Sequence, residues 1–264
     1  MKKLYVALAM SFGVMAGVSA NAQAEETLKI GVEAMYPPFE SKTADGKLVG
    51  FDIELGDAVC AKMKVKCEWV ESSFDGLIPA LNARKFDFIN SAMNITEPRQ
   101  RVINFTVPIY DVPSQLIVHK DTQIDLTADV LKAKDITVGV LQGSAQESFA
   151  KKHWQAKGVK VVSYQNQDQV YADLANNRIQ AALQKTPSAR ATFLDKEEGK
   201  DFKLVDGFAD DPSVLGVGTG FGIRKSDTAL KERLDAAIEE LKKEGFISEL
   251  SKKYFNADWV AKSN

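Results

Sequence analysis

The order of strand-like and helix-like segments constrains the fold of this chain more than any other sequence feature. Apolar runs typical of strands at residues 28–32, 65–70 and 86–89 alternate with helical patterns at 51–63 and after Ser72. This alternation predicts an open, largely parallel sheet with helices on both faces. Ligands of such sheets bind at the carboxyl ends of the strands. Three loops are expected there, at residues 33–36, 72–74 and 91–99.

A second alternating block follows, and the tail then returns to the first pattern. Strands are predicted at 115–118, 136–140, 159–163 and 179–183, with helices at 127–132 and 167–176. The tail adds a Gly-alternating strand within 215–223, a helix that Ser226 caps and that runs to about Lys243, and a helical segment at 247–254. Two such blocks, the second inserted into the first, predict two α/β lobes with a cleft between their loop ends.

The first 24 residues have the pattern of a secretory signal peptide. Lys2 and Lys3 precede an apolar run at 4–18 that is too short and too interrupted by Gly and Ser to span a membrane. Two A-x-A sites follow, and we expect cleavage after Ala24, with cleavage after Ala22 as the alternative. A lone membrane anchor is the competing interpretation. No later run approaches spanning length, so we expect the mature protein to be soluble in the exported compartment.

The charge balance argues against a nucleic-acid partner. The chain has 34 basic and 36 acidic residues, and loss of Lys2 and Lys3 with the leader leaves a net charge of −4. A mildly acidic surface of mixed sign lacks the basic patch that phosphate backbones require. The remaining 240 residues are enough for one large or two ordinary domains.

Two cysteines, Cys60 and Cys67, lie around the junction of a predicted helix and the next strand. In an oxidising compartment their even number and short separation favour a loop-closing disulfide. A metal site is the alternative, but it needs two more ligands, and His119 and His153 are isolated in the sequence. We therefore expect neither a metal nor a cofactor.

The stretch from Phe88 to Arg99 is the strongest candidate for a binding loop. A buried strand breaks into a short polar loop, and Thr96 then opens a helical turn that has Pro98 near its start and Arg99 just inside. Free backbone N–H groups, small polar side chains and one guanidinium converge there, which is how proteins hold a carboxylate. A plain strand-to-helix turn with a surface arginine is the alternative interpretation. Farther along, Gly143 and Ser144 likewise turn a strand into the start of a helix.

Several motifs in the same order resemble the periplasmic polar-amino-acid-binding proteins of ABC importers. The similarity covers essentially the whole mature chain and is greatest to the histidine and lysine/arginine/ornithine-binding group. The matching segments are IGVE (30–33), YPPF (36–39), GFD (50–52), FDGLIPAL (74–81), ITEPR (95–99), GVLQGS (139–144) and KKYF (252–255).

This resemblance implies a type II periplasmic-binding-protein fold, with two α/β lobes that close on the ligand about two crossovers. The crossovers are expected near Tyr110 and Gly218, so that lobe 1 comprises residues 25–110 and 219–264 and lobe 2 comprises residues 111–218. A disulfide that matches Cys60–Cys67 also occurs in the group. The implied function is that of a monomeric periplasmic protein, which captures a cationic amino acid and delivers it to the membrane permease of an ABC importer.

The resemblance also assigns roles to residues of the first lobe. Arg99 matches the arginine that clamps the ligand α-carboxylate, aided by Ser91 and by main-chain N–H groups near Asn94 and Ala145. Tyr36 and Phe74 match an aromatic pair that sandwiches a cationic or imidazole side chain, because flat π-faces attract a delocalised cation. Further matches are Glu33, which would pair the distal charge of that side chain, and the second-lobe contacts Ser144 and Gln146.

Four positions depart from the family pattern that holds the ligand α-ammonium. Lys185 stands at the place of an aspartate, Ala92 replaces a serine, Asn94 replaces Ser or Thr, and Ala145 replaces a threonine. An ammonium facing Lys185 would be repelled. In one account Lys185 swings out to solvent and the ammonium is held weakly. In the other, Arg99 and Lys185 together face a second carboxylate, as in an opine-like N-carboxyalkyl arginine, or the ligand is a guanidino or imidazole acid that lacks the amine.

Two other functional classes are compatible with such a fold. One is a cyclohexadienyl-dehydratase-like enzyme, which a changed amine site would suit, but no Ser/His or Cys/His pairing and no evident general acid support it. The other is the sensor lobe of a signalling protein, which would need a separate membrane partner. The sequence favours a transport binding protein over both.

Overall fold

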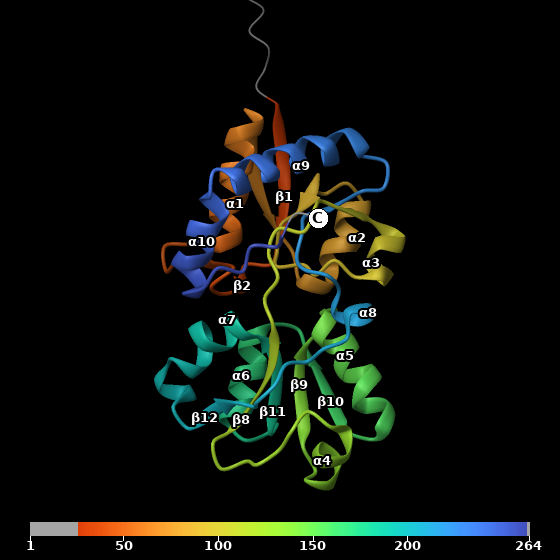
Figure 1. The fold of residues 1–264 in the computed structure, drawn as a ribbon, viewed down its shortest axis with the longest axis vertical. Helices are drawn as coiled ribbons and strands as arrows, with labels where there is room; N and C mark the ends of the chain where they lie inside the picture. Colours follow the sequence, from red (N-terminus) through yellow and green to blue (C-terminus); the bar gives the residue numbers. More distant parts are fainter. Residues whose placement is uncertain (1–25, 263–264) are drawn as a thin grey trace, which may run out of the picture.

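Two separate five-stranded sheets organise residues 26–262, the part of the chain that this computed structural model describes (Figure 1). The first sheet has the order β5-β1-β6-β13-β7. Strands β5, β1 and β6 are parallel, and β13 runs antiparallel to both β6 and β7. Its strands are β1 (Thr27–Val32), β5 (Lys66–Glu71), β6 (Phe88–Ile89), β7 (Asn104–Phe105) and β13 (Gly222–Ile223).

The second sheet has the order β10-β9-β11-β8-β12. Strands β10, β9 and β11 are parallel, whereas β8 and β12 complete the sheet in antiparallel pairs. Its strands are β8 (Ser114–His119), β9 (Thr137–Leu141), β10 (Lys160–Tyr164), β11 (Ala181–Lys185) and β12 (Phe202–Leu204). A small antiparallel sheet lies beside the first and is made of β2 (Met35–Tyr36), β3 (Glu40–Lys42) and β4 (Leu48–Val49).

Helices cover both faces of each sheet, and the two resulting bodies are called here the first lobe and the second lobe. The first lobe, uppermost in Figure 1, contains α1 (Phe51–Met63), α2 (Leu77–Asn82), α3 (Glu97–Val102), α9 (Thr228–Lys243) and α10 (Phe246–Phe255). The second lobe contains α4 (Ala128–Ala133), α5 (Ala145–His153), α6 (Gln167–Ala175) and α7 (Thr186–Ser188), and α8 (Pro212–Leu215) lies between the lobes. This arrangement confirms the predicted α/β class.

Apolar packing explains why these helices form where they do. In the first lobe, Leu55 and Val59 of α1 pack with Leu234 and Ile238 of α9 against one sheet face, and Leu81 of α2 covers the other. Their spacing is that of a helix with one apolar face. In the second lobe α4 and α5 cover one face of the sheet, and α6 covers the other.

The predicted tail differs from the structure in two places. The segment 215–223 is a strand only at Gly222–Ile223, because Gly216 and Gly218 have positive φ and turn the chain beside the Ile95 loop. Ser226 does not cap the following helix. Helix α9 begins at Thr228 with Asp227 at its N-cap position, and the Ser226 hydroxyl donates to Asp227 Oδ1 at 2.7 Å.

Two crossover segments join the lobes and pair with each other. Tyr110 and Thr219 form an antiparallel bridge, in which the Thr219 N–H donates to Tyr110 O at 2.8 Å. Tyr110 also bridges to Val260 near the end of the chain. Tyr110 and Thr219 thus belong to the connections between the two sheets, and the exact division of the chain into lobes stays a prediction.

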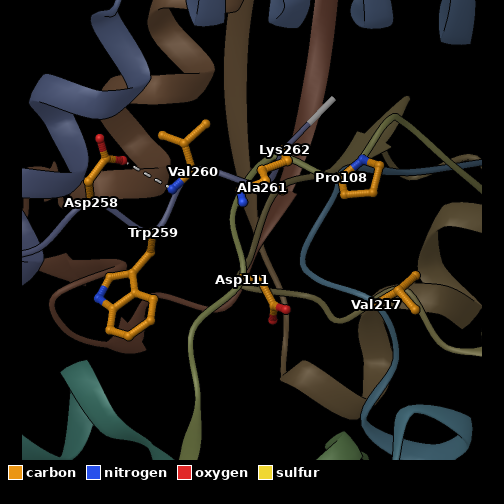
Figure 2. Close-up of a pocket in the computed structure, with 8 residues that line it drawn as sticks. All are labelled: Pro108, Asp111, Val217, Asp258, Trp259, Val260, Ala261 and Lys262. Atoms are coloured by element: carbon orange, nitrogen blue, oxygen red, sulfur yellow. Dashed lines mark hydrogen bonds between the residues drawn. The ribbon is translucent and has the colours of Figure 1, made fainter. Parts of the chain in front are cut away.

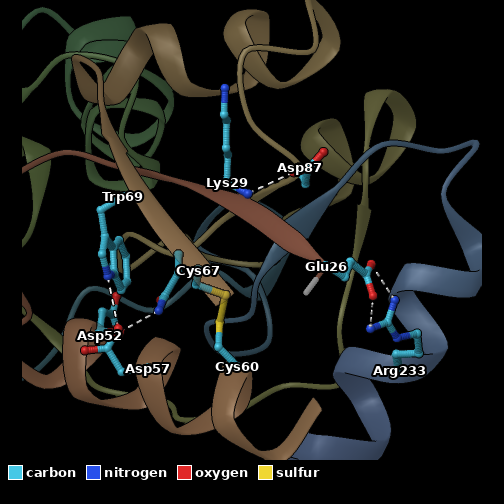
Figure 3. The surroundings of a disulfide bond; sticks show 10 residues. Glu26, Lys29, Asp52, Asp57, Cys60, Cys67, Trp69, Asp87 and Arg233 are labelled. Carbon is cyan, nitrogen blue, oxygen red and sulfur yellow. Dashed lines mark hydrogen bonds and ion pairs between the residues drawn. A yellow bond between two sulfur atoms is a disulfide. The ribbon is translucent and has the colours of Figure 1, made fainter. Parts of the chain in front are cut away.

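The disulfide prediction is confirmed. Cys60, in the last turns of α1, is bonded to Cys67 of β5, with the two Cα atoms 6.2 Å apart (Figure 3). Close by, Trp69 Nε1 donates to Asp57 Oδ1 at 3.1 Å, which ties the same strand to the same helix (Figure 3). The predicted signal peptide at 1–24 lies outside the described residues. Within 26–262, no helix combines the length and the apolar character needed to cross a membrane.

Replacing both Cys60 and Cys67 by Ser should lower the free energy of unfolding by about 2 kcal/mol, because the unfolded chain regains the freedom of a short loop. Denaturant titration of the oxidised native protein and of the double variant measures this difference. The far-UV circular dichroism of the folded variant should be unchanged, since helix α1 packs through its apolar face. Equal unfolding midpoints for the two proteins would contradict the stabilising role.

Candidate ligand-binding site

Hydrogen bonds between the loop ends of the two sheets hold the lobes together in a closed arrangement. Gln142 Nε2 of the second lobe donates to Asp75 Oδ2 of the first at 2.7 Å, and Thr192 Oγ1 donates to Pro37 O at 3.1 Å. Arg99 reaches across in the other direction, since its Nη2 donates to Gly143 O at 2.9 Å. Arg99, one of the side chains predicted to bind ligand, therefore lies where the lobes meet.

Arg99 provides a positive charge at one end of this inter-lobe site. Its Nη1 donates to Asn94 O at 2.9 Å, and its guanidinium lies 5.5 Å from the ring centroid of Phe74. Burial lowers the pKa of Arg99 to about 10, which leaves it charged at neutral pH. Within residues 26–262 no carboxylate forms an ion pair with it. A half-buried guanidinium without a carboxylate partner is suited to bind an anion.

The start of helix α5 faces the same place from the second lobe. The Ser144 hydroxyl caps the helix by accepting from the Glu147 N–H at 2.9 Å, and Ala145 and Gln146 form its first turn. The first N–H groups of a helix have no partner within the helix, and they attract negative charge. Arg99 and this helix start therefore create a place for one carboxylate between the lobes.

Polar groups without hydrogen-bond partners gather at a second end of the site. Buried Oε2 of Glu33 faces the second lobe, where the side chains of Gln167, Tyr171 and Ser188 also have buried atoms without a partner. Burial, together with the smaller effect of the Asp168 carboxylate, raises the pKa of Glu33 to about 7. Tyr36 lies beside these groups, and burial raises its pKa well above the usual value. A ligand cation carrying N–H donors would satisfy several of these atoms.

Lys185 occupies the third side, at the end of β11. Its side chain is buried, with the residue only 3% exposed, and its Nζ donates to Thr219 Oγ1 at 3.2 Å. Burial lowers the pKa of Lys185 to about 8, although the nearby carboxylates of Asp111 and Asp52 act in the opposite direction. The expectation that Lys185 swings to solvent is therefore wrong. The bond to Thr219 places the end of this side chain beside the crossover.

A buried pair of acids, Glu40 and Asp52, forms hydrogen bonds with the loop that follows β6 and leads to Arg99. Asp52 Oδ2 accepts from the Ala92 N–H at 2.6 Å, and Ser91 Oγ donates to Glu40 Oε1 at 2.9 Å while accepting from the Glu33 N–H. Burial raises the pKa of Asp52 to about 6 and that of Glu40 well above its usual value, so Glu40 holds the proton of the pair. The sequence analysis missed both acids, because nothing in their spacing shows that they are buried.

The remaining predicted residues lie at the inter-lobe site but make contacts within the protein. Asn94 Nδ2 donates to Leu215 O at 2.7 Å, and Gln146 Nε2 donates to Ser114 Oγ at 2.8 Å. Ala145 is buried at the start of α5. Direct ligand contacts by Ser91, Ala92 and these three residues therefore stay a prediction.

A separate groove lies at the crossovers and contains none of the predicted site residues (Figure 2). Its lining residues are Pro108, Asp111, Val217, Asp258, Trp259, Val260, Ala261 and Lys262. Among residues 26–262, no three His, Cys, Asp or Glu side chains are placed to hold a metal ion. The chemistry of the described chain therefore centres on the inter-lobe site.

Two α/β lobes, joined by paired crossovers and closed around an arginine, aromatic rings and buried carboxylates, define a hinged solute-binding protein. Residues 28–257 match the bacterial extracellular solute-binding proteins, family 3. The chain belongs to this family.

Named relatives agree with this assignment. The lysine/arginine/ornithine-binding periplasmic protein of Escherichia coli (strain K12) is 46% identical over 97% of this chain and 98% of the relative. The histidine-binding periplasmic protein of the same strain is 43% identical over 98% of each chain. A solved periplasmic binding protein of Salmonella typhimurium, described for its high arginine specificity, has a TM-score of 0.80 and 30% identity, over 87% of this chain and 99% of that one. The fold is thus that of type II periplasmic binding proteins, and the chain is a binding protein and not an enzyme.

Gly143→Ala should weaken ligand binding about tenfold, because it opposes lobe closure. Gly143 has a φ of +75°, and an added Cβ would stand 2.9 Å from Cβ of Asp75 on the other lobe. Calorimetric titration of both proteins with whichever arginine derivative the native protein binds measures the change in affinity.

Gly158→Ala is the matched control. Gly158 has a φ of +91°, but its added Cβ would meet the flexible end of Lys132 within the second lobe. This variant should lose comparable stability and keep its affinity. Equal losses of affinity in the two variants would show that backbone strain, and not hindered lobe closure, lowers the affinity.

Proposed function

We propose that this chain captures a cationic amino acid, or a derivative of one, in the periplasm and delivers it to the membrane permease of an ABC importer. One observation carries the proposal: the half-buried Arg99 guanidinium lies between the lobes, 2.9 Å from carbonyl oxygens of both, with no carboxylate partner in the described chain. The names of the relatives, which include lysine/arginine/ornithine-, histidine- and arginine-binding proteins, support the same ligand class.

Binding and closure are coupled in this proposal. The ligand carboxylate bridges Arg99 of the first lobe and the start of α5 in the second, while its cationic group lies between Tyr36 and Phe74 and reaches Glu33. Only the closed lobes provide both sets of contacts, so ligand shifts the population toward the closed state. The permease would then recognise the closed surface.

The proposal includes the organisation of the exported protein. Cleavage after Ala24 releases a mature chain that acts as a monomer, with lobe 1 formed by 25–110 and 219–264 and lobe 2 by 111–218. The two observed sheets support this division, since the first takes strands from both ends of the described chain and the second takes strands from its middle.

Arg99→Ala should weaken ligand binding about 100-fold or more, because two charge-assisted hydrogen bonds to the carboxylate are lost. Calorimetric titration with arginine and with arginine derivatives measures the effect. Arg99→Lys keeps the charge without the planar fork and should bind with intermediate affinity. The thermal unfolding profile of the free Arg99→Ala protein should match that of the native protein, and a large shift would assign Arg99 a structural role.

Ligand affinity should rise about tenfold between pH 5.5 and pH 7.5. Because the pKa of Glu33 is raised to about 7, most free protein carries a neutral Glu33 at the lower pH, and a cationic ligand must displace that proton. Titrations in buffers of different ionisation enthalpy should show proton release at pH 6 and little at pH 7.5. Glu33→Gln should flatten the profile, and a flat profile in the native protein would count against Glu33 as the partner of the cation.

A further inference from the structure

The surroundings of Lys185 restrict which derivative of a cationic amino acid can bind. We propose that the ligand of this protein has no primary α-ammonium group, and that it is either a guanidino acid without the amine or an arginine whose α-nitrogen carries a carboxyalkyl group. This inference rests on the proposed function and narrows its ligand class.

The Lys185 ammonium is placed beside the carboxylate end of the site. Its Nζ donates to Thr219 Oγ1 at 3.2 Å, and Thr219 forms a backbone bridge with Asn94. Asn94 O in turn accepts from Arg99 Nη1 at 2.9 Å. One short chain of contacts therefore connects the Lys185 ammonium to the guanidinium that would bind the α-carboxylate. The α-carbon of an amino acid held by Arg99 would place its nitrogen on this side of the site.

The charged groups that face Lys185 come from several elements. Asp52 and Glu40 belong to the first lobe, Asp111 lies on the crossover, and Arg99 reaches in from α3. Asp52 does not provide a ready acceptor for a ligand, since its carboxylate accepts from the Ala92 N–H and the Tyr110 hydroxyl at 2.6 and 3.1 Å. The raised pKa of Glu40 keeps that carboxyl neutral. A primary ammonium would thus enter as a third cation beside Arg99 and Lys185, which is unfavourable in a buried site.

Few side chains at this place could accept from an α-ammonium. Ala92 and Ala145 have no hydroxyl group, and the Asn94 side chain is held by the bond from its amide nitrogen to Leu215 O at 2.7 Å, so that only its amide oxygen is left as an acceptor. Lys185 itself has three N–H donors, and the bond to Thr219 uses one of them. Lys185 therefore offers the ligand positively charged N–H donors. Such donors suit a carboxylate, and they tolerate an uncharged methylene group in a ligand without an amine.

Two ligand chemistries share this requirement, and binding measurements separate them. 4-Guanidinobutyrate keeps the guanidinium and one carboxylate but has no amine. Octopine is arginine with a carboxyethyl group on its α-nitrogen. That nitrogen stays cationic, but the second carboxylate beside it offsets the charge and can pair with Lys185. Tighter binding of octopine would show an ion pair with Lys185, and tighter binding of 4-guanidinobutyrate would show that Lys185 fills the place of the amine.

The test is calorimetric titration of the native protein and of Lys185→Asp at pH 7 with L-arginine, 4-guanidinobutyrate and octopine. The native protein should bind at least one of the two derivatives about 100-fold more tightly than arginine. Lys185→Asp should reverse this order, because a carboxylate at this position attracts the primary ammonium. Lys185→Met, of similar length and without charge, should show an intermediate preference and keeps the test informative if the Asp variant folds poorly.

The outcomes distinguish this inference from the function on which it rests. If the native protein binds arginine as tightly as the derivatives and both Lys185 variants keep that preference, the inference is wrong and the proposed function stands. If the native protein binds none of the three compounds while it remains folded, the proposed function fails for the arginine class, and the inference fails with it.

Discussion

The buried carboxylate of Asp52 connects the segments on which the inter-lobe site depends. It accepts hydrogen bonds from the Ala92 N–H of the binding loop and from the Tyr110 hydroxyl of a crossover, and Asn90 Nδ2 donates to its backbone carbonyl at 2.6 Å. Burial of a carboxylate is unfavourable unless hydrogen bonds compensate it, and here the compensation comes from the loop and the crossover. These bonds fix three segments relative to one another: the first turn of α1, the loop that leads to Arg99, and the crossover at Tyr110.

The closed lobes also enclose groups that the protein alone does not satisfy. Arg99 has no carboxylate partner among the described residues, and Glu33, Gln167 and Tyr171 have buried polar atoms without hydrogen-bond partners. Each such group costs about 1–3 kcal/mol when it is removed from water. These groups make closure less favourable without a ligand than with a molecule of matching charge, which supplies the missing contacts. The same groups that confer affinity thus couple binding to closure.

Much of the fold could be predicted because its signals are local. Apolar periodicity predicted most strands of both sheets and the helices that cover them. The number and spacing of the two cysteines predicted the disulfide. The tail strand is shorter than predicted, because a crossover bends at Gly216, where the backbone passes close to Ile95. In the site, the motif predicted Arg99 at the start of a helix, and its carboxylate role, which the resemblance implies, stays a prediction. The burial of Glu40 and the orientation of Lys185 depend on contacts between segments that are far apart in sequence. No pattern around either residue predicts its burial.

The pairing of Tyr110 with Thr219 has a mechanical consequence. Two independent linkers would let the lobes twist and slide as well as bend, and each extra degree of freedom would add conformational entropy that is lost on closure. Two linkers bonded to each other act as one short ribbon, which bends easily about one axis and resists torsion. The open protein then searches a narrow arc of orientations, so that the second lobe meets the ligand in nearly the correct register each time it swings shut.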